Sequence, residues 1–300
     1  MKFVYLGTDA FSASVLGRLV EAGRTPDLVV TKPDSKQGRG RRLAPPPTAV
    51  TASELGLGLI QPQGPGEPEL LDAIEAIRPD VMCLCAYGAL IRDPLLSDHV
   101  ILNLHPSLLP RWRGAAPIER ALVAGDSETG VSIIRLVEAL DAGPVCLAER
   151  VAIGEEADFA TLSSELEEVG ARLLGEAMDR LAAGRLEFVE QSPEGVTYAE
   201  RIEAADRLLD PARPAVELER TVRALRPHIG ARLALPSGEA IGVRESRVST
   251  IELGRGALKE VDGEVVLGCS EGSLAISRVV PPGGREMASA DWLRGRPALG

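Results

Sequence analysis

Asn103 and His105 lie two residues apart at the end of a short apolar segment of a 300-residue chain. Residues 100–102, Val-Ile-Leu, predict the start of a short β-strand, and the chain must turn at Pro106. Side chains two apart on a strand leave from the same face, so an amide and an imidazole would lie side by side. The amide can donate a hydrogen bond to a developing oxyanion, and the imidazole can donate, accept or carry a proton. The same pair could also be an ordinary hydrogen-bonded loop.

Asp141 is the third residue whose type could serve this chemistry. It follows another predicted strand, residues 131–137, and stands in Leu-Asp-Ala-Gly-Pro at 140–144. An Asp before a Gly-Pro turn can simply cap that turn. Beside an imidazole, it could instead accept a hydrogen bond from the ring, orient it and take a proton from a substrate.

Three other kinds of site are not expected. Ser107 is not on a Gly-x-Ser-x-Gly elbow, so it should not form a hydrolase triad with His105 and Asp141. Residues 7–9, Gly-Thr-Asp, lack the spaced glycines of a dinucleotide-binding turn. The four cysteines show no metal-binding pattern, and we interpret them as small buried residues in a reducing compartment. We therefore expect no metal.

Strands and helices alternate along the part of the chain that must position these residues. Strands are predicted at 2–6, 27–31, 58–60, 80–85, 100–102 and 131–137, and helices at 10–21, 48–55, 67–77, 118–124, 158–184 and 214–225. This alternation predicts a doubly wound α/β domain with a mostly parallel sheet. Residues 81–86 are almost entirely apolar, as expected of a central strand next to the one that carries Asn103.

The last third of the chain has a different pattern. Short apolar segments separated by turns predict strands at 232–235, 240–243, 248–252, 264–267 and 274–279. Short strands at regular spacing suggest a small closed barrel. We expect one domain over residues 1–190, a linker over 191–207 and a second domain over 208–300.

The charge of the chain restricts its partners. With a net charge of −11, the protein cannot grip nucleic acid through a broad positive field, so any RNA contact must be local. Such a place exists at residues 36–42, where glycines and four cations form an exposed, flexible loop. A solvated surface loop and a phosphate-binding loop both fit this composition.

The N-terminus enters a strand directly and shows no signal peptide. The longest strongly apolar stretch without a charge, residues 81–91, is shorter than the ~20 residues of a transmembrane helix. We expect no membrane contact and a cytoplasmic location.

The string Asn-Leu-His-Pro-Ser-Leu-Leu-Pro-Arg-Trp-Arg-Gly-Ala-Ala-Pro-Ile at 103–118, with residues 125–133 and 140–144, resembles the formyltransferases that use 10-formyltetrahydrofolate. Among these it is most similar to those that act on methionyl-tRNA. The match runs in register from Phe3 to about Tyr198 and more weakly to the C-terminus. Asp9 stands where the family usually has proline, and 209–211 departs from the usual Ile-Asp-Trp.

This resemblance implies roles for particular residues. It implies catalysis by Asn103, His105 and Asp141, folate contacts from Ala86, Tyr87, Gly88, Leu90, Ser107, Leu108, Leu109, Pro110, Val137 and Glu138, and tRNA contacts from Lys36, Arg39, Arg41, Arg42 and Arg201. It also implies that the second domain is an OB-like barrel.

The implied reaction moves a formyl group from 10-formyltetrahydrofolate to the amino group of methionyl initiator tRNA. Its tetrahedral intermediate is anionic at oxygen and needs a donor, which Asn103 and a protonated His105 could supply, while Asp141 takes the amine proton. Alternatives that keep the chemistry are a sugar-nucleotide N-formyltransferase and a 10-formyltetrahydrofolate hydrolase-type enzyme. A non-catalytic RNA-binding protein is a third. The sequence contains no signal for an oligomer, and we expect a monomer.

Overall fold

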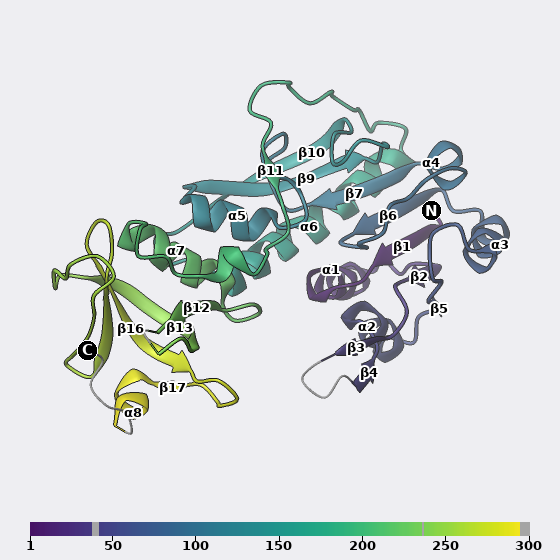
Figure 1. Cartoon of the computed structure of the whole chain (residues 1–300). Coiled ribbons are helices and arrows are strands. Elements are labelled where there is room, and N and C mark those ends of the chain that lie inside the picture. Colours follow the sequence, from purple (N-terminus) through teal and green to yellow (C-terminus); the bar gives the residue numbers. More distant parts are fainter. Residues whose placement is uncertain (38–41, 236, 295–300) are drawn as a thin grey trace. The chain divides into compact units, whose positions relative to one another are not determined.

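A computed structural model of the chain describes residues 1–37, 42–235 and 237–294, in two compact units (Figure 1). The first unit comprises Met1–Gly114, Glu128–Ala152 and Ser163–Tyr198. The second comprises Ala115–Ser127, Ile153–Leu162 and the chain from Ala199 onward. The long helix α6 (Phe159–Ala182) contributes to both units.

The first unit is built on a seven-stranded sheet in the order β10-β9-β7-β6-β1-β2-β5. Its strands are β1 (Phe3–Gly7), β2 (Leu28–Val30), β5 (Leu59–Ile60), β6 (Val81–Cys85), β7 (Ile101–His105), β9 (Glu128–Arg135) and β10 (Val145–Ala152). The strands from β5 to β7 pair in parallel, and β9 and β10 add in antiparallel fashion. The predicted mostly parallel α/β fold is confirmed, although β10 was not predicted.

The six predicted helices begin and end within two residues of the expected positions, whereas the short helices α4 and α8 were not predicted. They are α1 (Ala10–Glu21), α2 (Pro47–Glu54), α3 (Pro68–Ile77), α4 (Leu95–Asp98), α5 (Pro117–Ala124), α6, α7 (Ala215–Leu225) and α8 (Ser289–Leu293), with a short 3-10 turn at Ala205–Arg207. Asp9 caps α1 by accepting a hydrogen bond from the backbone N–H of Ser12 at 2.9 Å. The departure from the family pattern at residue 9 therefore has a local structural role.

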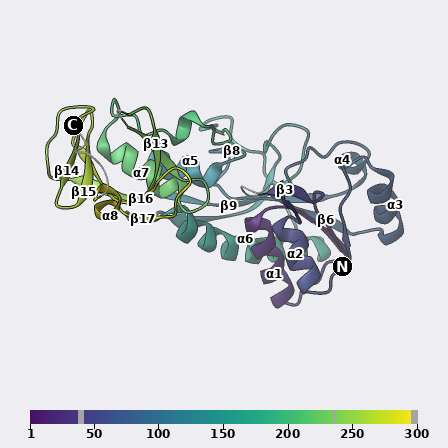
Figure 2. The same cartoon turned by 60° about the horizontal axis from the view of Figure 1, so that its bottom comes forward.

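Helices cover both faces of the sheet in the first unit. On one face, Met82 and Ile101 belong to a buried cluster with Leu70 and Ile74 of α3. On the other face, the Tyr5 hydroxyl donates to the backbone carbonyl of Ser12 in α1 at 2.8 Å. Figures 1 and 2 show α1 and α6 on the same side of the sheet. Because side chains alternate along a strand, the side chains at 103 and 105 leave β7 on the face of Ile101.

The thiols of the central strand are part of this core. Cys83 and Cys85 are free and buried, and burial raises the pKa of both thiols well above the ordinary range. Protonated, enclosed thiols are poor nucleophiles and poor metal ligands. The interpretation of these cysteines as small core residues is confirmed for Cys83, Cys85 and Cys269, while Cys146 is half-buried.

The described parts of the basic segment at 32–47 contain two short strands. Its described arms, β3 (Ser35–Gln37) and β4 (Arg42–Ala44), pair antiparallel as a hairpin. The segment was predicted as an exposed, flexible loop: the described arms are exposed, but they are paired strands, because backbone pairing needs no apolar pattern of its own. Residues 38–41 lie outside the described part of the chain.

The second unit has an antiparallel sheet in the order β12-β13-β16-β15-β14, with β17 paired to β16. Its strands are β12 (Ala231–Ala234), β13 (Ala240–Ser249), β14 (Leu258–Val261), β15 (Glu264–Gly268), β16 (Ser273–Val280) and β17 (Met287–Ala288). Within the described ranges no pairing joins β12 to β14, so the closed barrel suggested by the strand spacing is not closed by hydrogen bonds between these strands. OB barrels are often partly open in this way. The strand expected at 248–252 was wrong, since Val248 continues β13.

The core of this unit lies between its sheet and the helices α7 and α8. Leu218 and Val222 of α7 and Trp292 of α8 are buried against Ile241 and Ile276 of the sheet. None of the helices in the described ranges is long and apolar enough to cross a membrane.

Candidate active site

Strand β7 presents Asn103 and His105 on one face at its C-terminal end. Both side chains are buried, with 5% and 4% of their surface exposed. The strand lies between β6 and β9, so its backbone is fixed by hydrogen bonds on both edges. The two side chains are therefore held by the centre of the sheet and not by a loop, as the spacing predicted.

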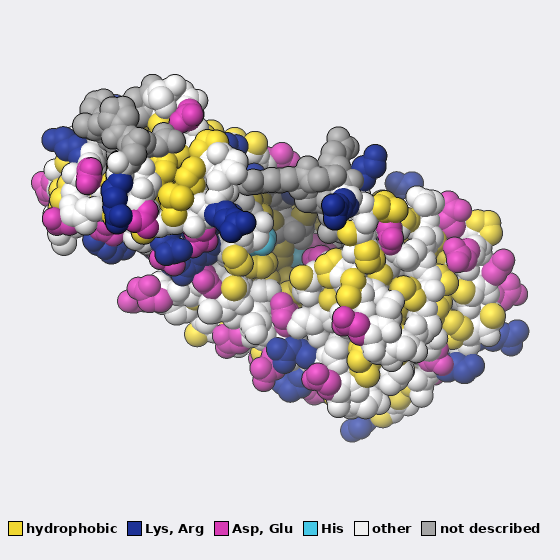
Figure 3. Space-filling view, turned by 90° about the horizontal axis from the view of Figure 1, so that it is seen from below, with side chains coloured by type: hydrophobic (Ala, Val, Ile, Leu, Met, Phe, Trp, Pro, Cys, Tyr) yellow, Lys and Arg dark blue, Asp and Glu magenta, His cyan; other side chains and the backbone are white. Residues whose placement is uncertain are grey.

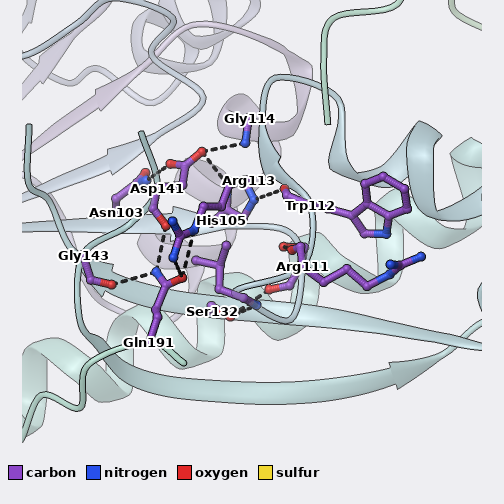
Figure 4. Close-up of polar contacts among 12 residues, drawn as sticks. Asn103, His105, Arg111, Trp112, Arg113, Gly114, Ser132, Asp141, Gly143 and Gln191 are labelled. Carbon is purple, nitrogen blue, oxygen red and sulfur yellow. Dashed lines mark hydrogen bonds and ion pairs between the residues drawn. The ribbon is translucent and has the colours of Figure 1, made fainter. Parts of the chain in front are cut away.

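Asp141 lies beside this pair, although it follows a different strand (Figure 4). One carboxylate oxygen, Oδ1, accepts a hydrogen bond from Nδ2 of Asn103 at 3.2 Å. The other, Oδ2, accepts from the backbone N–H of Gly114 at 2.9 Å and lies 3.6 Å from Nδ1 of His105. The structure thus brings the three predicted catalytic residues together around one carboxylate.

The backbone at Asp141 has a φ of +45°, in the left-handed region that non-glycine residues seldom adopt. Such a conformation costs on the order of 1–3 kcal/mol and persists only where surrounding contacts impose it. The contacts from Asn103 and Gly114 hold the carboxylate in place.

The second ring nitrogen of His105, Nε2, lies 2.8 Å from the backbone carbonyl of Trp112. A carbonyl oxygen only accepts, so Nε2 carries the hydrogen in this contact. In a neutral ring of that tautomer, the lone pair of Nδ1 would face the Asp141 carboxylate. A hydrogen on Nδ1 would instead be directed at the carboxylate oxygen, 3.6 Å away.

Asn103 retains a donor for an incoming group. Among the described residues its side chain makes one hydrogen bond, to Asp141, which uses one of the two amide hydrogens. The second amide hydrogen is available to an oxygen atom that enters the site. An amide donor beside an imidazole and a carboxylate is an arrangement that can stabilise a tetrahedral oxyanion.

Gln191 also contacts the site, although the sequence analysis placed it in the linker. Its amide nitrogen donates to the carbonyl oxygens of Asp141 at 2.7 Å and Gly143 at 2.8 Å. Its amide oxygen accepts two hydrogen bonds from the Arg113 guanidinium, at 3.1 and 2.7 Å. No local pattern marks this residue, because its partners lie far away in the sequence.

The sequence likewise contains no indication of the backbone groups of Trp112 and Gly114 that contact His105 and Asp141. Trp112 has a φ of +63°, which turns this short segment back toward β7. Nothing in its residue type predicts that conformation.

The expected folate-binding residues lie on three segments, which follow β7, β6 and β9. Ser107 is buried, and its hydroxyl donates to the carbonyl of Arg111 at 2.6 Å, so it closes its own loop. The backbone N–H of Leu109 donates to the Ser132 hydroxyl, and Leu108 and Pro110 are half-buried.

The second of these segments follows β6, the strand beside β7. Ala86 and Gly88 are exposed and have φ angles of +44° and +72°. Tyr87 is buried and its carbonyl accepts a hydrogen bond from Thr8, while Leu90 is 56% exposed. Between β9 and Asp141, Val137 is half-buried and Glu138 is exposed.

The expected tRNA-binding residues are not part of the catalytic cluster. Lys36 and Arg42 are exposed on the hairpin, and no hydrogen bond or ion pair within the described ranges links them to the three catalytic candidates. Arg39 and Arg41 lie outside the described residues, and Arg201 is exposed in the second unit. On the face in Figure 3, Lys and Arg side chains are interspersed with Asp and Glu, with no broad basic surface.

Over residues 1–37, 42–235 and 237–294, no group of three or more His, Cys, Asp or Glu side chains is arranged to hold a metal ion.

Comparison with known proteins identifies the family. The formyl transferase family model matches residues 1–178, and its C-terminal domain model matches residues 201–297. The methionyl-tRNA formyltransferase of Halorhodospira halophila is 41% identical, over 98% of this chain and 96% of its own length. The chain belongs to the methionyl-tRNA formyltransferase family. A further member, from Symbiobacterium thermophilum, is 40% identical over 98% of this chain and 92% of its own length.

Solved structures share the fold of this methionyl-tRNA formyltransferase family member at low sequence identity. HypX from Aquifex aeolicus in complex with tetrahydrofolic acid has a TM-score of 0.68 at 18% identity, over 98% of this chain and 47% of HypX. The N-formyltransferase from Helicobacter canadensis, in complex with folinic acid and dTDP-3-aminofucose, has a TM-score of 0.68 at 14% identity. That match covers 96% of this chain and all of the other.

Proposed function

We propose that the chain transfers the formyl group of 10-formyltetrahydrofolate to the amino group of methionyl initiator tRNA. The observation that carries this proposal is the Asp141 carboxylate, which accepts a hydrogen bond from Asn103 and lies 3.6 Å from Nδ1 of His105. Membership of the methionyl-tRNA formyltransferase family supports the choice of acceptor.

The reaction needs a donor for the formyl oxygen and an acceptor for the amine proton. The second amide hydrogen of Asn103 would bind the oxygen as it becomes anionic. Asp141 would accept the proton from the attacking nitrogen, directly or through water. His105 would hold the carboxylate in place and supply a second, charged donor to the oxyanion. For that step the carbonyl of Trp112 must share or release the hydrogen on Nε2.

The folate would bind along the two loops that follow β6 and β7. Ala86 and Gly88 offer exposed backbone groups to the polar edge of a pteridine ring, and Leu90 offers apolar surface to its face. On the other loop, Leu108, Leu109 and Pro110 would supply apolar contact, with Ser107 holding the loop closed. Val137 and Glu138 would complete these contacts between β9 and Asp141.

The tRNA would be bound through local cations. Lys36 and Arg42, on the arms of the hairpin, are exposed and able to contact phosphates, and we assign the same role to Arg39, Arg41 and Arg201. Because the whole protein carries a net charge of −11, such contacts must be few and should depend on salt.

The test is transfer of labelled formyl from 10-formyltetrahydrofolate to charged methionyl initiator tRNA. Uncharged tRNA, an amino-sugar nucleotide and water are the competing acceptors. Label on the charged tRNA alone is the expected result. Label on the sugar would indicate a sugar-nucleotide N-formyltransferase, and label released to water would indicate a hydrolase-type enzyme. Folate binding without any transfer would contradict the proposed chemistry.

Three further features complete the proposal. We propose domain limits of 1–190 and 208–300 with a linker between them, a cytoplasmic location and a monomeric state. Size-exclusion chromatography with light scattering tests the last of these.

A further inference from the structure

We propose that the stretch from Gln191 to Thr197 is a positioning element that holds both partners of the His105 ring. One partner is the Asp141 carboxylate and the other is the Trp112 carbonyl. The inference rests on the proposed formyl transfer, for which it adds residues that act through others and do not touch the substrate.

Gln191 fixes the Asp141 side of the ring. Its single amide group bridges the carbonyls of Asp141 and Gly143, at 2.7 and 2.8 Å. These two residues enclose the turn in which Asp141 has its left-handed φ of +45°. Because that conformation is intrinsically unfavourable, the turn needs outside contacts to persist. Without the two hydrogen bonds, the backbone could relax and carry the carboxylate away from His105.

Arg113 fixes Gln191 in turn. Two guanidinium nitrogens donate to the amide oxygen of Gln191, which leaves the amide nitrogen directed at the two carbonyls. The amide can therefore satisfy all these contacts in one orientation only. Arg113 belongs to the segment that contributes Trp112 and Gly114 to the site. Gln191 therefore links this segment to the turn that carries Asp141 (Figure 4).

Thr197 fixes the Trp112 side of the ring. The hydroxyl oxygen of Thr197 accepts a hydrogen bond from the backbone N–H of Trp112 at 2.9 Å. The carbonyl oxygen of Thr197 accepts a second one from the backbone N–H of Arg113, also at 2.9 Å. The peptide units around Trp112 are thereby held where the Trp112 carbonyl meets Nε2 of His105. One short stretch of chain thus sets the distance between the ring and both of its partners.

The experiment measures kcat, KM for folate and tRNA, and the unfolding temperature for Gln191→Glu, Gln191→Met and Thr197→Val. Gln191→Met removes every hydrogen bond of the amide at similar length. Gln191→Glu keeps the acceptor for Arg113 but loses the donor to the carbonyls. Gln63→Glu, the same change at an exposed glutamine of the same unit, is the matched control.

Both Gln191 variants should lower kcat about tenfold or more with little change in either KM, because small displacements of reacting groups cost rate. Thr197→Val should show a smaller loss of the same kind. In Gln191→Glu, acid should restore part of the rate relative to the parent, since a protonated carboxyl regains one O–H donor. Gln191→Met should show no such recovery.

The inference is overturned if the Gln191 variants match Gln63→Glu in kcat. It is also overturned if kcat falls only in step with the unfolding temperature and acid restores nothing in Gln191→Glu. The parent protein is assayed first. If the parent does not formylate methionyl-tRNA, the proposed function fails; an active parent with normal Gln191 variants contradicts the positioning role alone.

Discussion

The Nε2 atom of His105 lies 2.8 Å from the carbonyl oxygen of Trp112, seven residues further along the chain. This contact determines which ring nitrogen carries a hydrogen in the resting protein, and it leaves Nδ1 for the Asp141 carboxylate. The tautomer of the His105 ring is therefore set by a backbone group, whose position depends on the left-handed conformation of Trp112.

Replacing His105 should remove catalysis and leave the fold intact. We expect His105→Ala to lower kcat by about 100-fold or more, the range typical of a positioned acid–base group. The ring makes polar contacts only with Trp112 and Asp141 among the described residues, so secondary structure should be unchanged by circular dichroism. His99→Gln is the control for loss of an imidazole. Near-normal turnover in His105→Ala would contradict the mechanism.

Replacing Asn103 should affect the transition state more than binding. Asn103→Ala should reduce kcat by about 10²–10³, because one oxyanion donor is worth about 2.7–4 kcal/mol in the barrier. The KM values for folate and tRNA should change far less. The measurement is a full kinetic analysis with both substrates varied. An equal rise in both KM values at constant kcat would show that Asn103 serves binding only.

The cations of residues 36–42 should act on tRNA and not on folate. Arg42→Ala and Arg39→Ala should raise KM for methionyl-tRNA and reduce its dependence on salt, because each lost phosphate contact removes one unit of counterion release. Folate affinity, measured by fluorescence titration, should stay the same. Arg185→Ala, at an exposed arginine of the same unit, is the control. A change of folate affinity in the hairpin variants would contradict this assignment.

An ion pair in the second unit should make stability depend on acid pH. The hydrogen bond from Arg120 holds the pKa of Asp206 below its ordinary value of 3.8, and the closest contact between the two side chains is 3.0 Å. A carboxyl with a lowered folded pKa adds stability above its unfolded pKa and loses it as the pH falls through the folded value. Because both groups are partly exposed, we expect about 1 kcal/mol or less.

The measurement for this pair is denaturant unfolding of Asp206→Asn and the parent over a range of pH. The difference between the two should be constant near neutral pH and shrink as the pH falls below the ordinary Asp value. Asp72→Asn, at an exposed carboxyl with no hydrogen bond or ion pair recorded in the described ranges, should show no such trend. A difference that grew on acidification would have the wrong sign for this interaction.

Local sequence patterns determined much of the fold. The apolar strands, the helix bounds and the central position of β6 follow from periodicity, because a strand buried on both faces must be apolar throughout. The same logic put Asn103 and His105 on one face of β7, and the ordered string at 103–118 placed the chain in its family. These features depend on residues that are close together in the sequence, so they can be predicted from it.

Tertiary structure alone decided how the site is held together. The antiparallel addition of β10, the pairing of the hairpin arms and the contacts of Gln191 join segments that no local pattern relates. The left-handed backbone of Trp112 has no signature in residue type, and at Asp141 the residue type only permits it, since Asp adopts this region more often than most residues. Hydrogen bonds to backbone groups depend on where the chain runs in space, so the partners of His105 became visible only in the folded molecule.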